Sequence, residues 1–265
     1  MLLDALEALV AQRDAITLVG GQAIHLRTQS GDLLVASYTT DADLTVDPAV
    51  LSADPQLQEA MRGAGFTLGE NRSWLRSEQF GATFETVAVD LMVADTFSGP
   101  GSRRSGVIPP HSRDATRKTK GLEPAAIDSD LMAVPSLQPD DERVIEVKVA
   151  GPAALLIAKA HKLGGSGSGP GGNPPMQAKD AGDVFRLMGA FDVRDVVGRL
   201  RRLLDDERSA GATALGLDYL DQLFGGEGRR GVELAIDALG TAVDPDEIAT
   251  LAPAYTAQLT DVART

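Results

Sequence analysis

Apolar residues in the first half of the chain fall into short runs separated by turn residues, a pattern typical of strands that alternate with short helices. The runs predict strands at 16–19, 41–46, 66–69, 74–80 and 86–94. Amphipathic spacing and helix-start signals predict helices at 2–13, 22–28 and 54–62. This order of elements predicts a mixed sheet with helices packed on it.

The second half has a different pattern. A strand is predicted at 143–149, followed by a helix at 153–163. The next stretch, 164–172, consists of Gly and Ser with one Pro, the composition of a flexible linker. From residue 179 onward apolar residues recur at helical spacing, which predicts a series of helices with buried faces.

The two patterns divide the chain into two parts. We predict an α/β (α+β) protein, with a sheet-containing core in 1–150 and a helical region in 151–265. A chain of 265 residues can bury a sizeable core, and its hydrophobic content of 43% is ordinary for a globular protein.

Composition also narrows the chemistry and the cellular compartment. The chain has no cysteine, which excludes a disulfide framework, a thiolate metal site and a cysteine nucleophile. No apolar stretch approaches the roughly 20 residues of a membrane span, and the N-terminus lacks the basic-then-apolar pattern of a signal peptide. We therefore expect a cytoplasmic protein that does not associate with a membrane.

Three aspartates and a pair of glycines carry the clearest chemical signal. Asp41 and Asp43 are two positions apart on a predicted strand, so their side chains point to the same face. Asp90 lies in another apolar run, which we interpret as a neighbouring strand. Such carboxylates suit Mg²⁺ (or Mn²⁺), and the turn at Gly20 and Gly21 would let the backbone approach the phosphates of an NTP. Together they outline a nucleotidyltransferase.

A simpler interpretation exists for the pair Asp41 and Asp43, because most isolated DxD sequences are solvated edge or turn residues. Asp90 argues against it, since this residue interrupts the apolar run 86–94 and burying an unpaired carboxylate is costly. Either a metal ion or a paired basic side chain would satisfy Asp90. In the catalytic interpretation Asp90 completes the metal site and helps to deprotonate the acceptor.

The net charge of −13 argues against a broadly basic nucleic-acid-binding surface. Basic residues nevertheless concentrate in 99–121, where glycines and prolines predict a loop. They are Arg103, Arg104, Arg113, Arg117, Lys118 and Lys120. This segment is the candidate contact for a polyanion, with Arg104 and Lys118 as representative substrate-binding residues; the alternative is a merely solvated loop.

A second group of charged residues lies in the helical region. Lys159 belongs to an otherwise apolar helix, and Asp180 and Asp183, at i and i+3, share a face of a later helix. A lysine beside a triphosphate offsets its negative charge. Alternatively, Lys159 and Asp180 form an ion pair that braces the two helices, and the two roles are compatible. His161 is expected on the helix surface.

Four short sequences in this order resemble the AbiEii/MenT-type nucleotidyltransferase toxins. They are VGGQAIHL (19–26), TTDADL (39–44), LLIAK (155–159) and KDAGD (179–183). The resemblance implies a polymerase-β-like nucleotidyltransferase core and a toxin role in toxin–antitoxin or phage-defence pairs. It also implies nucleotide transfer from an NTP, in characterised members onto the 3′ end of tRNA.

Carried over by position, the resemblance makes Asp41 and Asp43 metal ligands, Lys159 the phosphate-binding lysine and Asp180 the later catalytic aspartate. Thr39 occupies a position where the family often has Ser or Thr. We therefore expect a nucleotidyltransferase toxin that acts on tRNA and has a cognate antitoxin. The alternatives are AMPylation-type transfer to a protein or a small molecule, and a non-catalytic binding module with the same fold.

Overall fold

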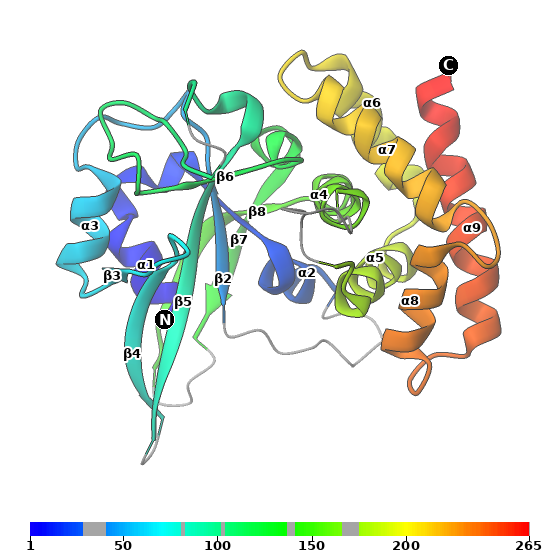
Figure 1. The fold of residues 1–265 in the computed structure, drawn as a ribbon, viewed down its shortest axis with the longest axis horizontal. Helices are drawn as coiled ribbons and strands as arrows, with labels where there is room; N and C mark the ends of the chain where they lie inside the picture. The colour runs from blue at the N-terminus through cyan, green and yellow to red at the C-terminus, as the bar shows by residue number, and fades with distance from the viewer. Residues whose placement is uncertain (29–40, 81–82, 102–103, 137–140, 166–174, 265) are drawn as a thin grey trace. The chain divides into compact units, whose positions relative to one another are not determined.

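The computed structural model describes residues 1–28, 41–80, 83–101, 104–136, 141–165 and 175–264 (Figure 1). The chain forms two compact units. Unit 1 consists of Met1–Ala23, Tyr38–Thr119 and Ser129–Ala150, and unit 2 of Ile24–Ser37, Lys120–Asp128 and Gly151–Thr265. One boundary between the units lies between Ala150 and Gly151, and two earlier segments, Ile24–Ser37 and Lys120–Asp128, cluster with the helices of unit 2. No helix in the described part of the chain is long and apolar enough to cross a membrane.

Unit 1 contains a mixed sheet, as predicted. Within the described residues it has eight strands: β1 (Ile16–Val19), β2 (Ala42–Val46), β3 (Thr67–Leu68), β4 (Trp74–Phe80), β5 (Thr83–Ala94), β6 (Arg117–Thr119), β7 (Ser129–Pro135) and β8 (Val144–Ala150). The order is β3-β4-β5-β2-β1-β8-β7, with β6 paired to β5 outside this path. β1 runs antiparallel to β2 and parallel to β8, and β2 runs parallel to β5. The central strands are buried, which explains their nearly continuous apolar runs.

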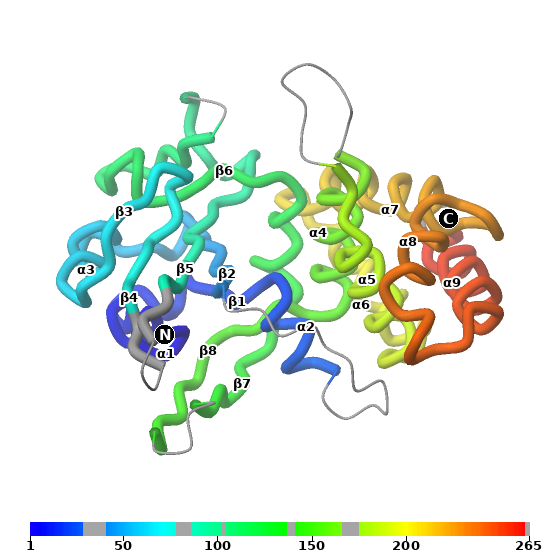
Figure 2. Tube along the Cα trace, turned by 60° about the horizontal axis from the view of Figure 1, so that its bottom comes forward, coloured from blue at the N-terminus to red at the C-terminus, as the bar shows by residue number. Residues whose placement is uncertain are grey.

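Two strands were missed by the sequence prediction. β6 lies inside the segment 99–121 that was predicted to be a loop, and it pairs in parallel with the end of β5. Its residues Arg117, Lys118 and Thr119 contain no apolar side chain, so backbone pairing with neighbouring segments, β5 among them, makes them a strand. β7 is the partner of β8 at the edge of the sheet (Figure 2). Most of its residues are exposed or half-buried, which leaves no clear alternation to detect.

Short helices cover part of the sheet. The predicted N-terminal helix is shorter than expected: α1 (Leu2–Ala8) is followed by a 3₁₀ helix, η1 (Val10–Ala15). α1 buries Leu3 and Leu6 and contacts both β8 and α3 (Leu57–Gly63). Short 3₁₀ turns, η2 (Asp95–Phe97) and η3 (Glu123–Ala126), occur in the connections after β5 and β6.

Unit 2 is dominated by helices, as predicted for 151–265. They are α4 (Pro152–Gly164), α5 (Ala178–Ala190), α6 (Val193–Asp205), α7 (Ala210–Phe224), α8 (Arg230–Leu239), α9 (Pro245–Thr260) and the 3₁₀ turn η4 (Asp261–Arg264). α4 packs against α5, α6 and α7, and most of its side chains are buried. Its first turn is held by the buried Asp128, which accepts a hydrogen bond from the Ala154 N–H at 3.0 Å and pairs with Arg199 of α6.

Candidate functional site

The registers of three central strands bring two of the predicted aspartates together. Asp43 on β2 is paired with Val19 of β1 on one side and with Asp90 of β5 on the other. Residues directly paired in parallel strands point to the same face of the sheet, so Asp43 and Asp90 are neighbours on one face. Asp41 immediately precedes β2 and is exposed. β5 is therefore the neighbouring strand that the sequence predicted.

Gly20, which directly follows β1, is the first residue of α2 (Gly20–Thr28). Its φ of +70° lies in the left-handed region, and a Cβ at this position would overlap the carboxylate of Asp43. Two independent constraints therefore require glycine here, and the missing side chain makes room for Asp43. Gly21 follows in the first turn of α2 and is half-buried. The positive end of α2 thus begins beside a carboxylate.

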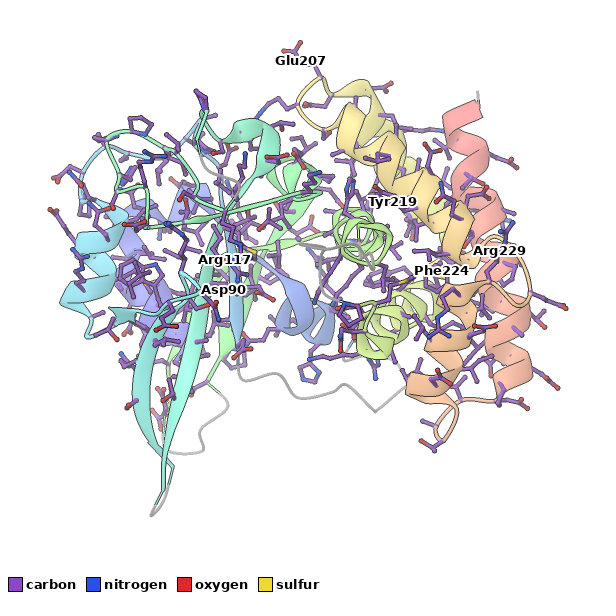
Figure 3. The ribbon with its side chains drawn as sticks, viewed as in Figure 1. Asp90, Arg117, Glu207, Tyr219, Phe224 and Arg229 are labelled. Carbon is purple, nitrogen blue, oxygen red and sulfur yellow. The ribbon has the colours of Figure 1, made fainter. Side chains whose placement is uncertain are left out.

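Asp90 has a basic partner. Its Oδ2 accepts a hydrogen bond from Arg117 Nη2 of β6 at 2.6 Å (Figure 3). The Asp90 side chain is 15% exposed and that of Arg117 is 33% exposed. Asp90 Oδ1 is buried and has no hydrogen-bond partner among the described residues. The structure thus contains the paired base that was one of the two expected solutions, while half of the carboxylate stays unsatisfied.

The three-carboxylate group expected from the sequence is not assembled in this structure. Within the described ranges, no three His, Cys, Asp or Glu side chains are grouped so that they could hold a metal ion. The pair Asp43 and Asp90 offers hard oxygen donors on one face, and Asp90 Oδ1 is a buried acceptor that still lacks a donor. These features fit a divalent cation that keeps several waters, so the magnesium site stays a prediction.

The basic segment offers less free positive charge than the sequence suggested. Arg117 pairs with Asp90, and Lys118 Nζ lies 3.0 Å from Asp95 Oδ1. Arg104 and Lys120 are exposed. Arg103 and Thr39, two residues expected to contribute to binding, fall outside the described residues.

In unit 2 the predicted charged residues form a buried network between α4 and α5. Lys159 Nζ donates to Asp180 Oδ1 at 2.6 Å and to Asp183 Oδ2 at 2.8 Å. Asp180 also accepts from Lys162, and Arg186 Nη1 donates to Asp183 Oδ1 at 2.8 Å. Each carboxylate is therefore shared between two cations. Lys159 is only 7% exposed, so the ion pair that braces two helices is present.

The pKa shifts agree with a tightly paired network. Burial by itself would lower the pKa of Lys159, but attraction to Asp183 and Asp180 and the hydrogen bonds to them outweigh it and raise this pKa. Burial would likewise raise the pKa of Asp180, yet Lys159 and Lys162 hold it below its ordinary value. Both side chains are therefore charged at neutral pH.

The position of His161 and the ion pair of Arg186 were not predicted from the sequence. His161 is buried, with Nε2 2.7 Å from the carbonyl oxygen of Ala212 and the ring edge-on to Tyr219, so its expected surface position is wrong. The packing of α7 against α4 buries it, which a single helix pattern does not reveal. Arg186 was not singled out, although its i+3 spacing from Asp183 is a usable signal.

The two groups of residues belong to different units: Asp41, Asp43 and Asp90 to unit 1, and Lys159 and Asp180 to unit 2. Comparison with known proteins adds no family assignment. No protein-family model matches the chain, and a search of curated proteins finds no match.

Proposed function

We propose that this chain is a metal-dependent nucleotidyltransferase that moves a nucleotide from an NTP to an acceptor hydroxyl. The observation that carries the proposal is the register of β1, β2 and β5, which places Gly20, Asp43 and Asp90 at one point of the sheet. A glycine-initiated helix, an acidic strand and a second acidic strand beside it form the outline expected of such an enzyme.

Asp43 and Asp90, with Asp41, would hold Mg²⁺ or Mn²⁺. When bound, the ion offsets the charge of the reacting phosphate and lowers the pKa of a coordinated hydroxyl. The buried Asp90 Oδ1, which has no hydrogen-bond partner among the described residues, is an acceptor suited to such an ion. Its carboxylate is also the proposed acceptor of the proton released by the attacking hydroxyl.

The reaction forms a bond between the acceptor oxygen and the α-phosphorus and breaks the bond to the β-phosphate bridge, releasing pyrophosphate. N–H groups in the first turn of α2, at Gly20 and Gly21, are suited to bind phosphate oxygens. The phosphate-binding role expected for Lys159 stays a prediction, and its ammonium group is already bound by Asp180 and Asp183.

The proposed acceptor is the 3′ end of tRNA, in a toxin that is held in check by a cognate antitoxin in the cytoplasm. This assignment rests on the sequence resemblance. Arg104, Arg113 and Lys120 are exposed basic residues of the segment 99–121 and are suited to contact RNA phosphates. Transfer to a protein or a small-molecule hydroxyl uses the same carboxylates and would not need these residues.

One observation favours a second candidate, a non-catalytic module of the same fold. Arg117 already neutralises Asp90, as expected of a site that binds no metal. Such a module would bind a partner or an NTP without turnover.

The test is incubation of the protein with each of the four α-labelled NTPs, Mg²⁺ and either total RNA or total protein. Label in RNA supports the proposed acceptor, and label in protein supports AMPylation-type transfer. The matched control is Asp43→Asn, which removes one charge and keeps the shape of the side chain. NTP binding without any labelled product would favour the non-catalytic module.

A further inference from the structure

The ion pair between Asp90 and Arg117 places a cation of the chain itself on a proposed metal ligand. Arg117 lies on β6, whose parallel pairing with β5 sets Arg117 opposite Met92, two residues beyond Asp90. From there its guanidinium donates to Asp90 Oδ2 at 2.6 Å. The contact is short and partly buried, as expected of a strong charge-assisted hydrogen bond.

The contact with Arg117 satisfies the carboxylate of Asp90 only in part. Asp43 and Asp90 are in register on adjacent strands, so two carboxylates repel each other on one face. The hydrogen bond of Arg117 reaches one oxygen of Asp90 and leaves Oδ1 buried without a donor among the described residues. A divalent cation on the same face would compensate this charge more completely than a single guanidinium contact.

We propose that Arg117 is a built-in counter-ion that competes with the divalent cation for Asp90. In the ligand-free protein Arg117 offsets the charge of this carboxylate through Oδ2, and its positive charge opposes the binding of a divalent cation at Oδ1. This inference rests on the proposed function, because it concerns the same carboxylates. Its physical basis is charge repulsion, since a guanidinium on Oδ2 and a cation on Oδ1 of the same carboxylate repel each other and the binding of the cation is weakened.

The direct test is the affinity for Mn²⁺ of the full-length protein, measured by isothermal titration calorimetry for wild type and Arg117→Gln. Removing this positive charge from beside the metal ligand should tighten Mn²⁺ binding by about tenfold. Arg117→Lys, which keeps the charge but not the planar fork, should lie between the two. If Arg117→Gln does not fold, the Mn²⁺ affinity of Arg117→Lys is compared with that of wild type instead.

Lys118→Gln is the matched control, because Lys118 is the next residue of β6 and forms a comparable ion pair with Asp95. This variant should keep the Mn²⁺ affinity of wild type. A second readout is the melting temperature: Arg117→Gln should melt lower than wild type without metal and gain more from Mn²⁺.

The results separate the two proposals. Mn²⁺ binding that is equally strong in wild type, Arg117→Gln and Lys118→Gln overturns the competition and leaves the proposed function intact. Absence of Mn²⁺ binding in wild type and in both Arg117 variants overturns the proposed metal site as well, and the competition with it.

Discussion

Lys159→Met is the variant that best separates the two roles considered for this lysine. Its ammonium group is buried between Asp180 and Asp183, at 2.6 and 2.8 Å. Methionine has a similar length and fills the same space without the charge. We expect the variant to lose stability, because two buried carboxylates lose a shared partner.

The expected loss in the free energy of unfolding follows from the ion pairs around Lys159. Removing one partner of a buried ion pair costs about 3–5 kcal/mol. Asp180 keeps Lys162 and Asp183 keeps Arg186, so the expected loss lies at the lower end, about 3 kcal/mol. For a chain of this size that corresponds to a decrease in melting temperature of about 6–12 °C.

The pH dependence provides an independent check. The pKa of Asp180 is held below its ordinary value of 3.8, so its stabilisation is present above that pH and is lost as the pH falls through the lower folded value. The pKa of Lys159 is raised above 10.5, so its stabilisation is present below that pH and is lost as the pH rises through the higher folded value. The difference in stability between wild type and Lys159→Met should therefore be largest near neutral pH, decrease as the pH falls through the folded pKa of Asp180, and decrease again as the pH rises through the folded pKa of Lys159.

The assay is urea unfolding followed by far-UV circular dichroism, which reports mainly on the helices, with the fluorescence of the single Trp74 as a separate probe of unit 1. Lys179→Met is the control, because Lys179 is exposed on α5. It should change stability by no more than about 0.5 kcal/mol. A fully stable Lys159→Met variant that no longer binds NTP would refute the bracing role and support direct phosphate contact.

Three further predictions concern unit 1 and the acceptor. Gly20→Ala should lose at least about 1–2 kcal/mol of stability in urea unfolding, from its positive φ alone and further from overlap with Asp43; an unchanged midpoint would contradict the geometry. Asp43→Asn and Asp41→Ala should abolish transfer of labelled nucleotide at an equal or higher melting temperature, since like-charge repulsion is relieved; retained transfer in either variant would remove it from the site. If RNA is the acceptor, neutralising Arg104 and Lys120 together should weaken RNA binding and flatten its dependence on salt. A salt response identical to wild type would exclude these two residues.

The strands whose ends were predicted most accurately are those that neighbouring residues in the sequence mark. β1, β2, β3, β4 and β8 fall within one residue of their predicted limits, because apolar runs flanked by turn residues mark them. β6 and β7 carry no such signal. A short strand of basic residues and an exposed edge strand become strands only through their partners, which are fixed by the fold.

The candidate site likewise has one part that local sequence signals predict and one part that depends on strand pairing. The spacing of Asp41 and Asp43 and the apolar run around Asp90 were sufficient to predict two acidic strands on one sheet. The partner of Asp90 was not predictable, because Arg117 reaches it only through the register of β6 against β5. Arg117 was instead grouped with the loop residues as a candidate contact for a polyanion.

By itself, then, the sequence determined the mixed sheet followed by helices and the positions of the acidic side chains, since periodicity and turn residues act over a few neighbouring positions. Only the tertiary structure decided which charges meet. It paired Asp90 with Arg117, 27 residues away, and enclosed Lys159 between Asp180 and Asp183, 21 and 24 residues away. Electrostatic partners depend on distances in space and on burial, and both arise only when strands and helices pack.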